Sequence, residues 1–242
     1  MADSPGPSIV AMNGTHESIQ DMNEKNLSRR AALVSGSLPG PHFPNEFGPE
    51  VKIFDSAFAA SALLPDLGDI ARCVLQRFRD ELLQYSPSQG QPYLREWIAR
   101  FMDEEGCKLS ARHIMVTNGA KHALDLVCRV LLDEGDLVAV TAPTYFTMLP
   151  IFRNHGARFV DVRQDDQGIV VADLAESFER LKQSGQRLPK MVYDIPDFHN
   201  PTGVTTTLER RRELVRLCSA EGVFIVEDSP YRRIRFSGEH VP

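Results

Sequence analysis

Polar side chains follow two apolar runs in the later part of the sequence. The run Met191–Ile195 is typical of a short buried strand, and it leads into the turn-forming sequence Asn-Pro-Thr-Gly at Asn200–Gly203. The run Val223–Val226 follows one helix later, and Asp228 and Tyr231 come soon after it. If both runs are neighbouring strands of a parallel sheet, an amide, a carboxylate and a phenol meet at its carboxyl edge, where open α/β sheets hold ligands. This set of groups suits a flat heteroaromatic ligand that has a ring oxygen and a ring nitrogen.

The elements that must position these groups alternate along the chain. Further apolar runs typical of buried strands occur at 114–117, 137–140 and 158–162. Apolar residues recur at helical spacing at 69–83, 93–104, 118–132, 173–182 and 208–221. Thr206 and Glu209 fit a capping box at the start of the last of these helices. The alternation of short strands with helices from residue 114 onward predicts an α/β fold with a mostly parallel sheet.

Composition excludes several classes of protein. The chain has 242 residues, of which 42% are hydrophobic, so it can bury a substantial core. The net charge is -6 and no block of basic residues suggests a nucleic acid or an anionic membrane, so we expect no nucleic-acid partner and no membrane partner. No secretory signal is expected at the start of the chain. The four cysteines have neither CxxC nor metal-ligand spacing, which indicates reduced thiols of a cytosolic protein and predicts no metal site.

The Asn-Pro-Thr-Gly loop and the later sequence Glu-Asp-Ser-Pro-Tyr at 227–231 together resemble the class I/II aminotransferases that use pyridoxal phosphate (PLP). Within that group the sequence is most similar to the 2-aminoadipate and aromatic amino-acid aminotransferase branch. The resemblance covers most of the chain from Tyr85 to Phe236. It implies the PLP-dependent transferase fold of type I, with a mostly parallel sheet, flanking helices and its C-terminal part missing. It also implies amino transfer between an amino acid and a 2-oxo acid, by a homodimer in the cytoplasm.

The resemblance implies cofactor-binding roles for individual residues. Asp228 would accept the hydrogen bond of the protonated pyridine nitrogen, and Asn200 and Tyr231 would donate to the ring oxygen. Tyr145, in the sequence Ala-Pro-Thr-Tyr, would stack on the pyridine ring. Tyr85, in the sequence Tyr-Ser-Pro-Ser-Gln-Gly, would reach the cofactor phosphate of the neighbouring subunit.

The resemblance places the cofactor phosphate at the turn that begins the helix near residue 118. A glycine turn at a helix N-terminus exposes backbone N–H groups and the positive end of the helix dipole, and both attract a phosphate. Gly119, Ala120 and Lys121 form this turn. Ala120 stands where a serine is usual in the family, and Lys121 where a glutamine is common. Lys121 either adds a point charge beside the phosphate or points into solvent.

One residue of the family pattern has no counterpart in this chain. The Schiff-base lysine of the family lies in a Ser-x-Ser-Lys stretch beyond the tyrosine that Tyr231 matches, whereas every lysine here precedes Asp228. We therefore assign no catalytic residue, and we expect the 242-residue chain alone to be inactive, as the N-terminal part of a longer enzyme. Two alternatives stay open: a PLP-dependent C–S or β-lyase of the same fold, and a non-catalytic truncated protein of this fold.

The sequence divides into three parts. Residues 1–30 are rich in polar residues, Gly and Pro, which predicts a disordered N-terminal arm. Residues 31–110 are interpreted as an N-terminal segment with part of a small domain. Residues 111–242 are interpreted as a truncated PLP-binding large domain.

Overall fold

The computed structural model describes Ser28 and residues 61–241. The arm predicted at 1–30 lies outside the described residues except for Ser28, as do residues 31–60. The helices of the described chain are α3 (Gly68–Leu82), α4 (Pro92–Glu104), α5 (Gly119–Leu131), α6 (Leu149–Asn154), α7 (Val171–Gln183) and α8 (Leu208–Glu221). Short 3₁₀ turns occur at Ser61–Leu63, Ala111–His113 and Phe146–Met148.

A five-stranded sheet forms the centre of the fold, in the order β3-β2-β1-β4-β5. Its strands are β1 (Leu137–Ala142), β2 (Arg158–Asp165), β3 (Gly168–Ile169), β4 (Met191–Asp194) and β5 (Phe224–Glu227). All neighbouring strands are parallel except β2 and β3, which form an antiparallel pair. The fold is therefore α/β with a mostly parallel sheet, which confirms the prediction from the alternating pattern.

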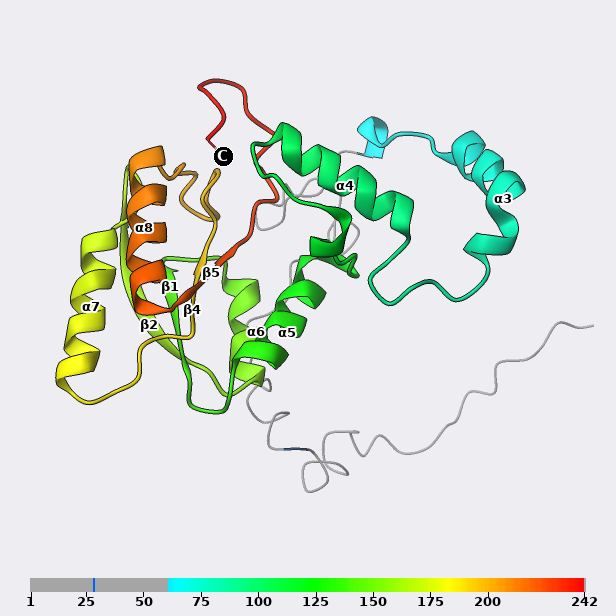
Figure 1. Ribbon diagram of the computed structural model, residues 1–242. Helices are drawn as coiled ribbons and strands as arrows, with labels where there is room; N and C mark the ends of the chain where they lie inside the picture. The colour runs from blue at the N-terminus through cyan, green and yellow to red at the C-terminus, as the bar shows by residue number, and fades with distance from the viewer. Residues whose placement is uncertain (1–27, 29–60, 242) are drawn as a thin grey trace, which may run out of the picture.

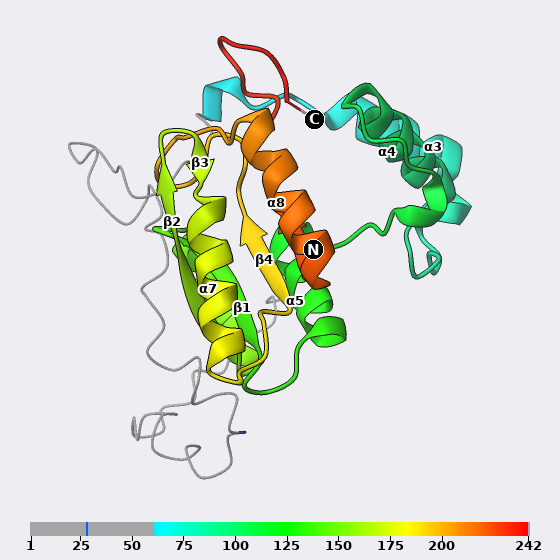
Figure 2. The same cartoon turned by 60° about the vertical axis from the view of Figure 1, so that its left-hand side comes forward.

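Helices cover both faces of the sheet, so the protein has three layers (Figures 1 and 2). Helices α5 and α6 pack on one face and α7 and α8 on the other. Neighbouring side chains of a strand point to opposite faces. On β4, Tyr193 accordingly joins the cluster that contains Phe152 of α6, whereas Val192 joins the cluster that contains Leu214 of α8.

Two expectations about local structure are wrong. Residues 114–117 form no strand, because their backbone bonds lie outside the sheet: the N–H of Val116 donates to the carbonyl of Gln89 at 2.9 Å, in the loop before α4. The cap of α8 is Thr207 rather than Thr206, and its hydroxyl accepts from the N–H of Arg210 at 3.4 Å. Thr206 is instead buried against β3, where a Cβ on Gly168 would lie 2.4 Å from its hydroxyl oxygen.

Helices α3 and α4 lie to one side of the sheet layers (Figure 1). Both helices match the periodicity found in the sequence within a residue or two. No residue of α3 is buried, and on α4 only Ala99 is buried. Trp97 and Phe101 of α4 stack with their ring centroids 5.4 Å apart, although Trp97 remains half exposed. These two helices therefore contribute little to the core that supports the site.

None of the helices in residues 61–241 combines the length and the apolar character that crossing a bilayer requires.

Candidate functional site

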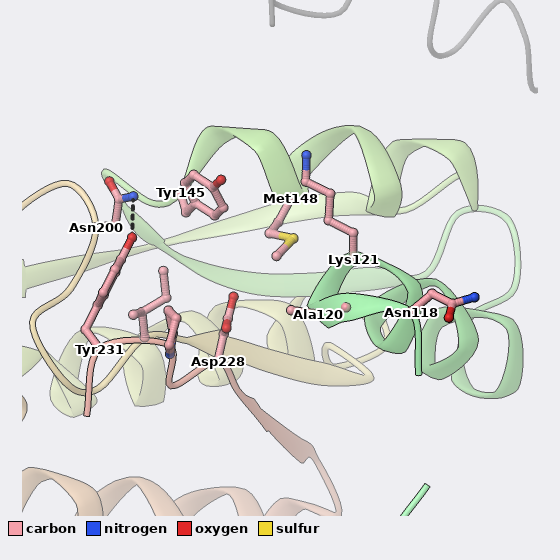
Figure 3. Close-up of a pocket in the computed structure, with 11 residues that line it drawn as sticks. Asn118, Ala120, Lys121, Tyr145, Met148, Asn200, Asp228 and Tyr231 are labelled. Carbon is pink, nitrogen blue, oxygen red and sulfur yellow. Dashed lines mark hydrogen bonds between the residues drawn. The ribbon is translucent and has the colours of Figure 1, made fainter. Parts of the chain in front are cut away.

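A cavity of about 380 Å³ opens at the carboxyl edge of the sheet (Figure 3). Small-molecule sites generally have volumes of about 300–1,000 Å³, so this cavity can hold a ligand of cofactor size. Its lining residues come from the start of α5, the loop after β1, the loop after β4 and the segment after β5. They are Asn118, Gly119, Ala120, Lys121, Tyr145, Met148, Ile195, Asn200, Asp228, Pro230 and Tyr231.

The cavity brings together seven of the eight residues that the sequence nominates for cofactor binding. These are Gly119, Ala120, Lys121, Tyr145, Asn200, Asp228 and Tyr231. The eighth residue, Tyr85, is fully exposed in the loop between α3 and α4 and does not line the cavity. Tyr85 is predicted to contact the cofactor of a neighbouring subunit, which a single chain cannot test, so this role stays a prediction.

One end of the cavity is the N-terminus of α5. Gly119 begins this helix with a φ of 83°, in the left-handed region that favours glycine, so the chain can turn sharply into the helix. The unpaired N–H groups of a first helical turn attract an anion. Lys121 also borders the cavity, and its amine points away from Asp228, past Met148 (Figure 3). Groups that attract an anion thus border the cavity at the start of α5.

The cavity is also lined by Asp228, which directly follows β5. Its N–H donates to the carbonyl of Asp194 at 3.0 Å, which continues the pairing of β4 with β5 by one residue. Its Oδ2 accepts a hydrogen bond of 2.8 Å from the hydroxyl of Tyr193. Tyr193 is 1% exposed, and burial, followed by the charge of Asp228, raises the pKa of its phenol well above the usual value. The phenol is therefore a neutral donor at any ordinary pH.

Tyr193 is a site residue that the sequence reasoning missed, because it was interpreted only as part of an apolar strand. No local sequence signal could have found it, because the contact depends on the strand register that the structure supplies. Tyr193 lies opposite Val226, two residues before Asp228. On a parallel ladder, a tyrosine at this position can reach past its direct partner to the residue after the strand.

Asn200 and Tyr231 approach each other across the cavity, and the amide nitrogen of Asn200 lies 3.5 Å from the Tyr231 hydroxyl (Figure 3). The loop that carries Asn200 is held by His199, whose ring lies 2.9 Å from the Thr141 hydroxyl and 3.1 Å from the Thr202 hydroxyl. His199 is 1% exposed, and its burial lowers its pKa, so the neutral ring is favoured. The loop therefore has a fixed anchor on β1.

A buried ion cluster, also missed by the sequence reasoning, joins the Asn200 loop to the segment that carries Tyr231. Asp197 is completely buried and accepts from three arginines. Its partners lie at 3.0 Å (Arg211 of α8), 3.2 Å (Arg232) and 3.0 Å (Arg235). Because Arg232 is the neighbour of Tyr231, this cluster fixes the position of the phenol relative to Asn200.

The chemistry of these groups fits PLP. A carboxylate suits a protonated ring nitrogen, and an amide N–H and a phenol O–H suit a ring oxygen. An aromatic side chain, Tyr145, suits the face of a ring. The start of α5 suits a phosphate. All four kinds of group line the same cavity, in one arrangement.

Residues 63–240 match the family described as aminotransferase class I and II. The match covers well over half of the sequence, and the chain belongs to this family. It is 40% identical over 210 residues to an aromatic-amino-acid aminotransferase of Thermococcus litoralis, covering 86% of this chain and 46% of that protein. It is 33% identical over 219 residues to a 2-aminoadipate transaminase of Thermus thermophilus, covering 89% of this chain and 48% of that protein.

A solved structure is similar in three dimensions. The crystal structure of the α-aminoadipate aminotransferase from Thermus thermophilus, complexed with N-(5′-phosphopyridoxyl)-L-leucine, matches with a TM-score of 0.68 and 34% identity, over 76% of this chain and 45% of that one. The fold is thus the PLP-dependent transferase fold of type I, and PLP is the cofactor that the family and this complex indicate. The chain spans about half the length of the curated relatives it matches.

Proposed function

We propose that these residues form the cofactor-ring part of an aminotransferase active site, which moves an amino group from an amino acid to a 2-oxo acid. One observation carries the proposal: four segments, between Gly119 and Tyr231, converge on one cavity that a carboxylate and a helix N-terminus both line. The relatives named above support the reaction class, and their names favour aromatic amino acids and 2-aminoadipate as donors.

Each side chain of the cavity has a task in this proposal. PLP, when bound, supplies an electron sink for the α-carbon of the amino acid. Asp228 accepts the ring N–H and keeps the ring cationic through its charge. Asn200 and Tyr231 donate to the ring oxygen and orient it. Tyr145 covers a face of the ring, and the start of α5 with Lys121 binds the phosphate.

The simplest test is binding of PLP by the purified chain, followed through the absorbance of the cofactor. We expect saturable binding without a covalent link, because every lysine precedes Asp228 and the Lys121 amine points away from that residue. Borohydride reduction and mass spectrometry should then find no pyridoxyl-lysine. A stoichiometric adduct at one lysine, together with turnover of an amino acid and 2-oxoglutarate, would contradict this expectation and identify the lysine that completes the site.

We further propose a homodimer in the cytoplasm. The four cysteines are free, and Cys128 and Cys218 are buried, as expected for a reducing compartment. Tyr85 belongs to this proposal, because its exposed hydroxyl is available to a second subunit. Tyr85→Phe should weaken PLP binding about fivefold, the value of one hydrogen bond, with the thermal unfolding unchanged. Equal affinity in the variant, or PLP binding by a monomer in sedimentation measurements, would show that Tyr85 has no such role.

A further inference from the structure

Tyr193 lies behind the wall of the cavity and connects the sheet interior to the site. Its ring is 1% exposed and packs edge-on against Phe152 of α6, with centroids 5.6 Å apart. Its hydroxyl lies 2.8 Å from Oδ2 of Asp228. Packing between the sheet and α6 therefore fixes the ring, and the hydroxyl makes one polar contact, with Asp228.

Asp228 depends on this contact. It follows β5, a strand whose side chains are mostly exposed, and no other residue in the described part of the chain donates to its carboxylate. The carboxylate points into the cavity (Figure 3). Because Tyr193 occupies Oδ2, the other oxygen is left for a ligand, and rotation of the carboxylate would break the hydrogen bond.

We propose that Tyr193 is a positioning residue, which holds the Asp228 carboxylate in the orientation that receives a protonated pyridine nitrogen. This inference rests on the proposed function, since it concerns the same cavity. It assigns to β4 a role beyond packing, because a side chain of this buried strand orients the carboxylate that directly follows β5. A role in packing alone predicts a different outcome, because Tyr193→Phe keeps the whole buried ring.

The test uses 4-deoxypyridoxine 5′-phosphate, which lacks the aldehyde and therefore binds without any lysine. Affinities are measured by titration calorimetry for the full 242-residue chain and for Tyr193→Phe. We expect the substitution to weaken binding about fivefold, the usual value of one hydrogen bond. The matched control is Tyr93→Phe on α4, a half-exposed tyrosine outside the cavity, which should bind like the unsubstituted protein.

Two further readouts separate positioning from packing. First, Tyr193→Phe should have no effect on binding when it is combined with Asp228→Asn, because the phenol acts through that carboxylate. Second, the bound ring nitrogen should lose its proton about 0.7 pH unit lower in Tyr193→Phe, since a fivefold loss for the cationic ring alone corresponds to that shift. The absorbance of the bound ring reports this titration. The other titratable groups around the cavity (Lys121, Tyr145, Tyr231 and the buried Asp194) are the same in both proteins.

The outcomes distinguish this inference from the function on which it rests. If the unsubstituted chain does not bind the probe, the proposed function fails and the role of Tyr193 fails with it. If the chain binds but Tyr193→Phe has the same affinity and the same ring titration, only the positioning role is overturned. An equal loss of affinity in the Asp228→Asn background would also overturn it, because the effect would then come from packing.

Discussion

Strands β4 and β5 are neighbours of equal length, and both arise from apolar runs, yet they differ completely in burial. All four residues of β4 are buried, whereas three of the four residues of β5 are exposed. The reason is their place in the sheet. β4 lies between β1 and β5 under helices on both faces, while β5 is at the edge and pairs only with β4 within residues 61–241. An apolar run therefore predicts a strand, but its neighbours decide how much of it is buried.

The site combines the two strands. Asp228, the proposed partner of the ring nitrogen, follows the exposed strand, and its carboxylate is held by Tyr193 from the buried one. A buried residue of the sheet thus orients a side chain at its exposed edge. Three substitutions, each described below, test whether the difference in burial between β4 and β5 determines stability and cofactor binding. They are given from the largest expected effect to the smallest.

The largest effect is expected from Met191, which is completely buried on β4 and lies opposite Phe224 of β5. Met191→Ala should lower the free energy of unfolding by about 2–5 kcal/mol, since it removes buried contacts and leaves a cavity. Phe224 is 58% exposed, so Phe224→Ala should change that free energy by no more than about 0.5 kcal/mol. Urea denaturation of both variants measures the contrast. Similar losses in the two variants would show that β5 is covered in solution.

A somewhat smaller effect is expected at Asp194, which is 2% exposed at the end of β4. Burial raises the pKa of its carboxyl from 3.8 to about 6, and one of its oxygens has no hydrogen-bond partner. The folded state therefore binds the proton more tightly than the unfolded state, so stability is lost as the pH rises from 3.8 through 6. Asp194→Asn, which cannot ionise, should be more stable than the unsubstituted protein at pH 8 by up to about 3 kcal/mol.

The pH dependence supplies the control for this prediction. The advantage of Asp194→Asn should shrink as the pH falls through 6 and vanish only below 3.8, where the natural carboxyl is protonated in both the folded and the unfolded state. The residue opposite in register is Glu227 of β5, which is exposed. Glu227→Gln should change stability by less than about 1 kcal/mol at either pH. Parallel stability curves for Asp194→Asn and the unsubstituted protein would mean that Asp194 is better solvated than its burial indicates.

The smallest of the three effects in free energy concerns Asp228 itself, and it appears in binding rather than in stability. Asp228→Asn should weaken PLP binding about tenfold to a hundredfold, the range for a hydrogen bond to a charged group. Because Asp228 follows the exposed strand, thermal unfolding should hardly change. Absorbance titration with PLP and a thermal melt measure the two quantities. Unchanged affinity would remove Asp228 from the cofactor site.

The sequence predicted well where a single element carries the signal. The apolar runs that became β1, β2, β4 and β5 and the periodic segments that became α5, α7 and α8 were found, because the spacing of apolar residues is a local property of the sequence. The strand predicted at 114–117 was wrong, because the apolar pattern does not show whether the backbone N–H groups bond to another strand. The N–H of Val116 bonds to a loop carbonyl instead. The cap of α8 was misplaced by one residue because Thr206 and Thr207 are adjacent and chemically alike.

Contacts between distant segments could not be predicted in the same way. The cavity residues were predicted from a family resemblance. Their spacing in the sequence does not by itself predict that Gly119 and Tyr231 line the same cavity. The Asp197 cluster depends on arginines that follow it by up to 38 positions, and nothing in their local sequence marks them as buried partners. The bond from Tyr193 to Asp228 likewise requires the strand register, which the structure supplies.

The wide separation of the cavity residues along the chain has a consequence for synthesis on the ribosome. The phosphate end of the cavity, at Gly119, is translated well before the carboxylate and the phenol at Asp228 and Tyr231. At roughly 5–20 residues per second, an interval on the order of 5 to 20 s separates the two ends. The nascent chain cannot retain a ring-shaped ligand during that interval, because β4 and β5 have not yet paired. We therefore expect cofactor retention only after the ribosome has translated the chain through Tyr231.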